Sequence, residues 1–305
     1  MVMLHCSHAG FYILESVFSD FMMKKTKRYL LLLAPFLLLA VLYELLPLLM
    51  ILVNSFRSDS GSSLFTFENY RNIFSKLLYR KAIANSIKIS LLSSLIGILI
   101  AVLGAKALHQ RGGKLGQAFL SILNMVSNFA GVPLAFAYMI LLGNAGVMVQ
   151  FGRLNGISAL ADFDLYTTNG MSLIYVYFQI PLATLLVLPA FAGVRKEWQE
   201  AASLLGAGGF TFWKRIGLPV LLPSILGTFS VLFSNALAAY ATAYALMMNS
   251  LSLLPIQIAG CFVGEVKVQR GLGSALSVVM MGIMVVMILL TNSIGRSCRK
   301  GVDLV

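Results

Sequence analysis

The sequence predicts an all-α integral membrane protein with six transmembrane helices. Hydrophobic residues make up 59% of the 305 residues and charged residues only 11%, whereas about 25% of the residues of a soluble protein are charged. The mean hydropathy of +0.87 agrees with this composition. A helix needs about 20 largely apolar residues to cross the hydrocarbon layer, and several segments reach that length. Because lipid offers backbone groups no hydrogen-bond partners, we expect these segments to be helical.

Six apolar segments are predicted to span the membrane. They are residues 29–53, 84–108, 118–142, 172–194, 221–247 and 275–294. Between and around them lie a cytoplasmic segment (1–28), an external loop (54–83), a cytoplasmic loop (195–220) and a cytoplasmic tail (295–305). Glu15 and Asp20 interrupt the N-terminal segment, which is therefore not typical of a cleaved signal. The Met22-Met23 pair leaves open where translation begins.

The lysine and arginine distribution predicts that both termini are cytoplasmic, because basic residues accumulate on the inner side of membrane proteins. Basic clusters flank the first and last spans at Lys24, Lys25, Lys27, Arg28, Arg296, Arg299 and Lys300. Others mark the second and fourth loops, at Lys106, Arg111, Lys114, Arg195, Lys196, Lys214 and Arg215. The external loop is the exception, with Arg57, Arg71, Lys76, Arg80 and Lys81. We attribute the net charge of +12 to this topology and expect no nucleic-acid partner.

The cysteines and histidines form no pattern that predicts a metal site or a set of disulfides. They are Cys6, Cys261, Cys298, His5, His8 and His109. A structural metal site would require several ligands at close spacing. We expect no metal and no cofactor bound by this chain.

One cytoplasmic loop carries a distinctive pattern: Glu200-Ala201-Ala202, three residues, Gly206, nine residues, then Ile216-Gly217-Leu218-Pro219. Residues 197–205 are predicted to form a short helix whose small side chains allow close approach of a partner. The Glu200 carboxylate suits an arginine of that partner or the backbone N–H groups of a turn. Gly206 supplies a sharp turn. A second short helix is predicted over 210–216, with Phe210, Trp213 and Ile216 as an apolar ridge, and Pro219 fits the first turn of the next span.

This pattern resembles the cytoplasmic EAA loop of ABC importer permeases of the type I class. The resemblance implies that Glu200, Ala201, Ala202, Gly206, Ile216, Leu218 and Pro219 couple the chain to separate ATPase subunits, which bind ATP and Mg. It also implies a second permease subunit, identical or different, and an extracytoplasmic solute-binding protein, in a prokaryotic cell membrane. The chain has no G-x-x-x-x-G-K-[ST] phosphate-binding motif, since Gly112-Gly113-Lys114 lacks the upstream glycine and the hydroxyl residue.

Further segments resemble polyamine permeases of the spermidine and putrescine type. They include Pro35, Pro47, Ser55-Phe56, residues 65–70, Asn85-Ser86, residues 239–246 and Pro255-Ile256. The resemblance implies a polyamine or a related small molecule as the solute, with phosphonate, thiamine and iron as other candidates.

Polar residues inside the spans are candidates for the translocation pathway, because each costs free energy in lipid unless it faces a cavity or another helix. The candidates are Asn124, Asn128, Gln179, Asn235, Tyr240, Thr242 and Tyr244. Each of them can instead form a hydrogen bond that only joins two helices. The resemblance to ABC importer permeases also implies a five-helix core over residues 84–294, with the first helix at its periphery. Glu44 lies in that first helix and is interpreted as structural. Small residues of the second span predict a seam at which two helices pack closely, namely Gly97, Ala101, Gly104 and Ala105.

The main alternative function is an ion-coupled secondary transporter of a small solute. Such transporters usually show inverted repeats, broken helices and paired charges inside the membrane, and the sequence shows no such repeat or charge pair. An enzyme is not expected, because no nucleophile, base or metal-ligand set lies at a useful spacing. A scaffold protein remains compatible with the composition alone.

Overall fold

The computed structural model describes residues 33–59, 65–111, 113–247, 251–263 and 268–302, and all regular structure in these ranges is helical. Six of the described helices are long and apolar enough to cross a membrane: Leu33–Ser55, Leu77–Gln110, Val132–Leu154, Thr168–Phe191, Gly209–Ala238 and Arg270–Ser297. The predicted all-α class and the number of membrane helices are therefore confirmed. The predicted segment 1–28, the start of the first span and the last three residues of the tail lie outside the described residues.

The chain divides into two units, Met1–Asn54 and Ser55–Val305. In the first unit the described residues form one apolar helix that contains a π-helical turn, η1 (Val41–Leu45), followed by α2 (Leu46–Ser55). Glu44 lies in this turn and is exposed. The side chains of this helix are largely exposed within the unit, as expected of a helix whose surroundings are apolar lipid.

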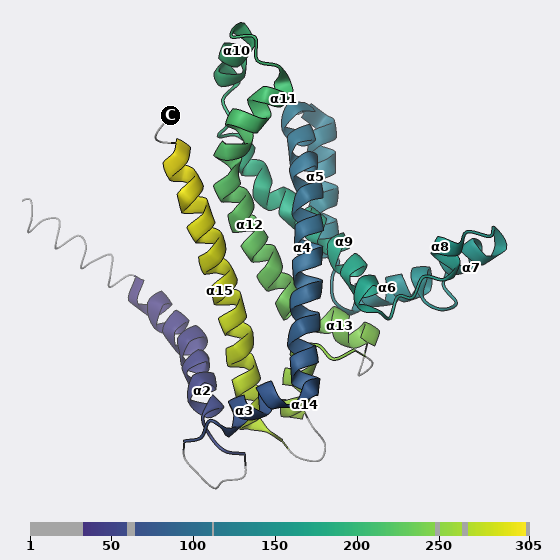
Figure 1. Cartoon of the computed structure of the whole chain (residues 1–305), viewed down its shortest axis with the longest axis vertical. Coiled ribbons are helices and arrows are strands. Elements are labelled where there is room, and N and C mark those ends of the chain that lie inside the picture. Colours follow the sequence, from purple (N-terminus) through teal and green to yellow (C-terminus); the bar gives the residue numbers. More distant parts are fainter. Residues whose placement is uncertain (1–32, 60–64, 112, 248–250, 264–267, 303–305) are drawn as a thin grey trace, which may run out of the picture. The chain divides into compact units, whose positions relative to one another are not determined.

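The second unit is built from fourteen described elements. In chain order they are α3 (Glu68–Ser75), α4 (Leu77–Arg111), α5 (Gly113–Asn128), α6 (Val132–Leu142), α7 (Val147–Leu154), α8 (Ser158–Ala161), α9 (Thr168–Phe191), α10 (Lys196–Leu204), α11 (Gly209–Phe212), η2 (Trp213–Gly217), α12 (Leu218–Ala238), α13 (Tyr240–Met247), α14 (Leu254–Val263) and α15 (Arg270–Val302). The helices α4, α12 and α15 stand side by side, and α9 packs against both α4 and α12 (Figure 1).

Small residues bring α4 and α9 into close contact. Ala101 and Ala105 of α4 are fully buried. A Cβ atom on Gly97 would lie 3.0 Å from the Cβ of Gln179 in α9, and one on Gly104 would lie 3.8 Å from the hydroxyl of Thr184. The predicted packing seam is therefore tightest at Gly97, whereas a Cβ atom at Gly104 would make an ordinary van der Waals contact.

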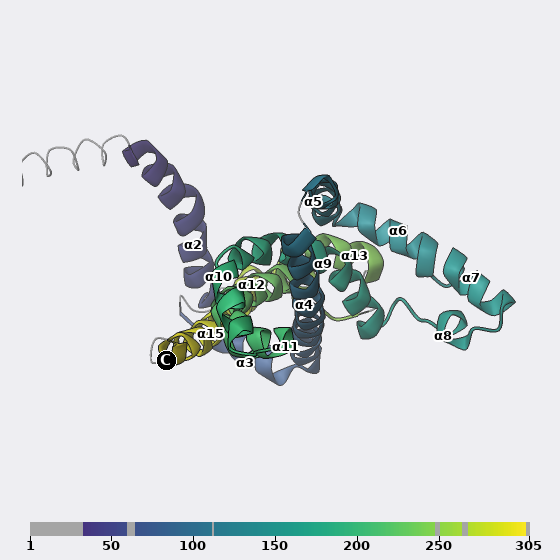
Figure 2. The same ribbon diagram turned by 90° about the horizontal axis from the view of Figure 1, so that it is seen from above.

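The predicted third span, 118–142, is wrong as a single helix. The helix α5 ends at Asn128, and α6 starts at Val132 after Gly131, which has φ of +76°. Pro133 lies in the first turn of α6, where its missing N–H is tolerated but where it prevents an unbroken helix. Figure 2 shows α6 and α7 running sideways from the packed helices.

The predicted fifth span, 221–247, is also interrupted. The helix α12 ends at Ala238, and Ala239 has non-helical φ and ψ of −69° and 91°. The Tyr175 hydroxyl of α9 donates a hydrogen bond of 2.8 Å to the Ala239 carbonyl. Thr242 of α13 in turn bonds both to the N–H and to the carbonyl of Gly131, at 3.0 and 3.2 Å. Side-chain bonds from neighbouring helices thus satisfy the backbone groups that the two breaks release.

The other predicted boundaries differ by several residues. The second and sixth spans are longer than predicted, at Leu77–Arg111 and Arg270–Val302, so α15 includes most of the predicted tail. The fourth, Thr168–Phe191, starts and ends earlier than the predicted 172–194. The predicted external loop, 54–83, contains α3 and the start of α4. Within it the Asp59 carboxylate accepts bonds of 2.7 and 3.0 Å from the N–H groups of Gly271 and Leu272. Asp59 therefore caps the N-terminus of α15 from a distant part of the chain.

Candidate functional site: the loop between α9 and α12

The first half of the patterned loop is the helix α10, predicted over 197–205 and observed as Lys196–Leu204. It begins with acidic Glu197 in its first turn, which is favourable at a helix N-terminus. Ala202 is buried, with 8% exposure, and anchors the helix. Leu204 and Leu205 at its end are 89% and 87% exposed. The Glu200 side chain is exposed too, so α10 presents both a carboxylate and a large apolar surface.

Gly206 ends α10 by a specific hydrogen-bond arrangement. Its N–H donates to the Ser203 carbonyl at 3.0 Å, and the Ala207 N–H donates to the Ala202 carbonyl at 2.9 Å. This is the Schellman motif, in which the residue after the helix adopts a left-handed conformation. Gly206 has φ of +78°, as that motif requires. The sharp turn predicted at this glycine is thus present.

The second half of the loop is not the separate helix predicted over 210–216. One turn of α-helix, α11, continues through the π-helical turn η2 directly into α12, giving one helix over Gly209–Ala238. The predicted apolar ridge is also wrong: Phe210 is 83% exposed, whereas Phe212 is 2% exposed. A π turn holds more residues than an α turn, so a spacing of three residues no longer marks one face. Pro219 lies in the first turn of α12, as predicted.

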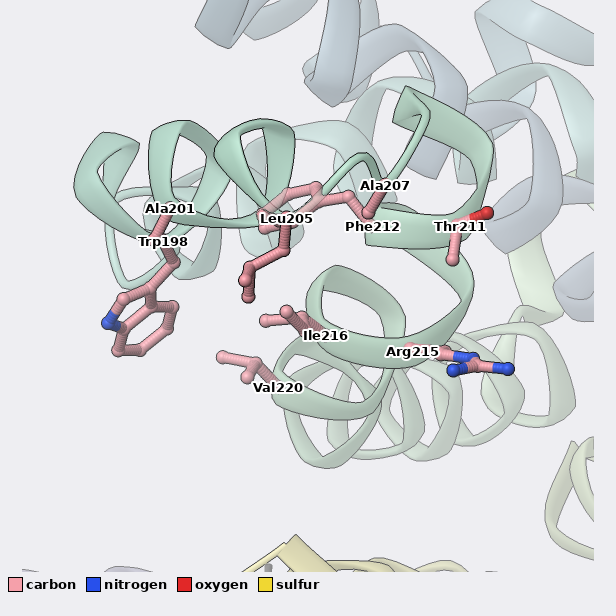
Figure 3. A pocket seen from close by; sticks show the side chains of 10 residues that line it. Trp198, Ala201, Leu205, Ala207, Thr211, Phe212, Arg215, Ile216 and Val220 are labelled. Atoms are coloured by element: carbon pink, nitrogen blue, oxygen red, sulfur yellow. The ribbon is translucent and has the colours of Figure 1, made fainter.

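An apolar groove of about 630 Å³ lies between α10 and the start of α12. Leu205, Ile216 and Val220 face one another across it, and Arg215 lies at its edge (Figure 3). The other lining residues are Trp198, Ala201, Ala202, Ala207, Thr211 and Phe212. The structure thus brings Ala201 and Ala202 of the first half of the pattern next to Ile216 of the second. Glu200 and Leu218 are exposed and do not line the groove.

The candidate pathway residues fall into a buried pair and an exposed group. Gln179 is fully buried, and its Nε2 donates to the hydroxyls of Ser93 and Ser94 in α4 at 3.2 and 3.0 Å. Thr242 is buried by its contact with Gly131. The buried pair therefore joins helices within the chain.

The remaining pathway candidates are exposed on this chain. Asn124 and Asn128 of α5 each donate to the carbonyl four residues earlier, at 3.0 and 2.8 Å. Asn235 is exposed near the end of α12. Tyr240 and Tyr244 of α13 stack with ring centroids 5.2 Å apart and are 38% and 48% exposed. These five residues therefore belong to the surface of this chain, in contrast to Gln179 and Thr242.

The structure adds residues to this site that the pattern did not reveal. Phe212, Phe191 and Lys106 surround Trp213 next to the groove. Of these three residues, only Lys106 had a signal in the sequence, since it is a charged residue at the end of an apolar span. Among the side chains that the structure describes, no three His, Cys, Asp or Glu residues are grouped as metal ligands.

The loop lies in a region of the chain that matches a known protein family. Residues 93–300, about two thirds of the chain, match the family model described as the binding-protein-dependent transport system inner membrane component. The matched region includes α9, the loop with its groove, and α12. The chain therefore belongs to this family of membrane permease components.

Individual relatives are distant and differ in their solutes. The probable sulfate transport system permease protein cysT of Helicosporidium sp. subsp. Simulium jonesii is 28% identical over 43% of this chain and 51% of its own length. The spermidine/putrescine transport system permease protein PotB of Haemophilus influenzae is 26% identical over 61% of this chain and 66% of its own length. The chain thus spans about half to two thirds of these relatives.

A solved structure shows the same fold. A chain of a bacterial ABC transporter involved in the import of the acidic polysaccharide alginate is 18% identical, with a TM-score of 0.69, and the match covers 90% of this chain and 98% of that one. At this identity the likeness concerns the fold alone. It confirms that the helices are arranged as in an ABC importer permease.

Proposed function

We propose that the chain is the membrane permease subunit of an ATP-binding cassette importer and forms half of its solute pathway. The observation that carries this proposal is the surface of the loop between Glu200 and Pro219. Leu204, Leu205 and Phe210 are all more than 80% exposed beside an apolar groove. A loop beyond the ends of the membrane helices lies in water, where such an apolar surface marks a protein partner.

The proposed partner at this surface is a separate ATPase. The exposed Glu200 carboxylate suits a charged hydrogen bond to a basic side chain of that partner. The chain itself lacks the glycine-rich phosphate-binding motif, so ATP and Mg would bind to the ATPase. Because α11, η2 and α12 form one helix, a displacement of the loop would move α12 directly.

We further propose that the end of the second unit bearing α10 faces the cytoplasm. The C-terminal ends of α4 and α15 lie at this same end (Figure 1). It carries the basic residues Lys106, Lys114, Arg195, Lys196, Lys214, Arg215 and Arg296. Their accumulation follows the positive-inside rule. The opposite end, with α3 and α14, would then face the solute-binding protein, and both termini would be cytoplasmic.

The exposed polar residues support a pathway shared with a second permease subunit. We propose that Asn124, Asn128, Asn235, Tyr240 and Tyr244 line this pathway, with Gln179 and Thr242 fixing the helices behind them. A single cysteine at Asn235 or Tyr240 should react with a small hydrophilic thiol reagent in membranes. The matched control is Leu103, which is 68% exposed on α4 and would face lipid. Equal reactivity at both places would contradict the assignment.

A polyamine or a related small molecule is the proposed solute. The support is the resemblance of segments such as residues 239–246 to polyamine permeases, together with the similarity to PotB over 61% of the chain. The names of the relatives mention sulfate in one case and spermidine and putrescine in another, so these names cover more than one class of solute. Isolation of the associated solute-binding protein and mass spectrometry of its native ligand would test the assignment, and a sulfate or sugar ligand would contradict it.

Purification of the tagged chain in mild detergent tests the proposed function. We expect a nucleotide-binding subunit to be recovered with it, together with ATPase activity in the eluate. A chain that purifies alone and carries solute under an ion gradient without ATP would instead be a secondary transporter.

A further inference from the structure

Trp213 lies where three membrane helices meet. Its ring centroid is 5.9 Å from that of Phe191 in α9, whose side chain is fully buried. The Nζ atom of Lys106 in α4 lies 4.5 Å from the centroid of the Trp213 ring. This distance is within the range of a cation–π interaction, and tryptophan is the strongest aromatic partner for a cation. The first residue of η2 is thus in contact with both α4 and α9.

Gly217, at the other end of η2, constrains the position of the same ring. A Cβ atom on Gly217, the last residue of η2, would lie 2.5 Å from Cε3 of Trp213. The ring therefore rests on the backbone of Gly217 and spans the π turn. Because the ring contacts Gly217 across the turn, its position depends on the geometry of this turn. Such π turns often occur at functional sites. A change in the turn would move the ring against Lys106.

We propose that Lys106 is a positioning residue that couples movement of the α10–α11 loop to α4 through its contact with Trp213. The inference rests on the proposed function, because the ATPase would supply the movement. Movement of the loop would be transmitted to α12 through the continuous helix from Gly209 to Ala238. The Trp213 ring would transmit the same movement to α4, which carries the packing seam against α9.

Substitutions separate the charge of Lys106 from its packing. Lys106→Met keeps the apolar stem and removes the cation, whereas Lys106→Arg keeps a cation that can lie over the ring. Lys214 belongs to the same π turn and is exposed. Lys214→Met is therefore a matched loss of one positive charge without the contact to the ring.

Hydrogen exchange of the co-purified complex in lipid nanodiscs tests the inference without knowledge of the solute. Exchange is measured by mass spectrometry for residues 101–110 of α4 and 196–212 of the loop, with and without ATP and vanadate. We expect both segments to respond to nucleotide in the natural chain. In Lys106→Met the α4 response should fall at least threefold while the loop response and the bound ATPase remain. Lys106→Arg and Lys214→Met should respond as the natural chain does.

An unchanged α4 response in Lys106→Met, or an equal loss in Lys214→Met, would overturn the inference. A natural complex whose loop responds while α4 does not would overturn it as well and leave the proposed function intact. Absence of any ATPase from the natural complex would instead refute the proposed function. If Lys106→Met does not insert, Lys106→Gln and Trp213→Phe carry the same test.

Discussion

Gly206→Val is expected to abolish transport while the chain still inserts into the membrane. Gly206 has φ of +78° and no other atom lies within 4 Å of the position of an added Cβ atom. The cost of valine therefore comes from the backbone conformation, about 1–2 kcal/mol for an ordinary residue and more for a β-branched one. A penalty of this size shifts the equilibrium between the Schellman turn and other conformations about tenfold or more against the turn, and so changes the direction of α10. ATP-dependent uptake into vesicles, normalised to inserted protein, measures the effect.

Gly208→Val is the matched control for this substitution. Gly208 lies two residues further along the same loop, with ordinary φ and ψ of −67° and 160° and no atom within 4 Å of its Cβ position. Valine adopts these angles without strain. Transport should therefore remain near that of the natural chain. Normal transport by Gly206→Val, or equal losses in both variants, would show that the turn does not couple the subunits.

Glu200→Ala should weaken association of the ATPase roughly 10- to 100-fold, because a hydrogen bond to a charged group is lost at the interface. Glu200 is exposed on α10, on the loop that also presents Leu204 and Phe210. Docking of the solute-binding protein should change much less, since its proposed site is the opposite end of the second unit, with α3 and α14. Titration of each purified partner against the chain in nanodiscs measures both affinities.

Glu197→Ala provides the comparison within the same helix. Glu197 is also exposed, lies in the first turn of α10 and is outside the Glu-Ala-Ala pattern. Its removal takes away the same charge and should reduce ATPase affinity only slightly, by its effect on the helix dipole. Equal losses at the ATPase and binding-protein surfaces in Glu200→Ala would contradict the proposed contact.

Local sequence signals predicted the first half of the loop well, but not the second half. The turn at Gly206 depends on one glycine and on hydrogen bonds within five residues, so its neighbours alone indicate it. The helix α10 matched its predicted range within one residue at each end. The π turn was not predicted, because it depends on the packing of Trp213 against Gly217 and neighbouring helices.

Of the two breaks in the membrane helices, one has a signal in the local sequence and the other has none. Gly131 followed by Val132-Pro133 is a recognisable helix breaker, and the apolar run across it concealed the interruption. The break at Ala239 lies in a run of alanine, leucine and tyrosine without glycine or proline. It depends on the hydroxyl of Tyr175, 64 residues earlier in the chain. Such a contact becomes visible only when the helices are packed.

The burial of Gln179 also depends on a contact between helices that are distant in the sequence. The sequence identified it as a polar residue inside a span, and it left open whether the side chain lines the pathway or forms a bond between helices. Its contacts with Ser93 and Ser94 come from α4. Only the pairing of α4 with α9 shows that Gln179 lies between them.

An electron cryo-microscopy structure of the chain with the partners that co-purify with it would show directly whether this loop binds an ATPase. We expect an ATPase subunit bound to α10, covering Leu204 and Phe210 and placing a basic side chain within hydrogen-bond distance of Glu200. A complex in which this loop remains exposed, or a chain that transports its solute with no ATPase bound, would contradict it.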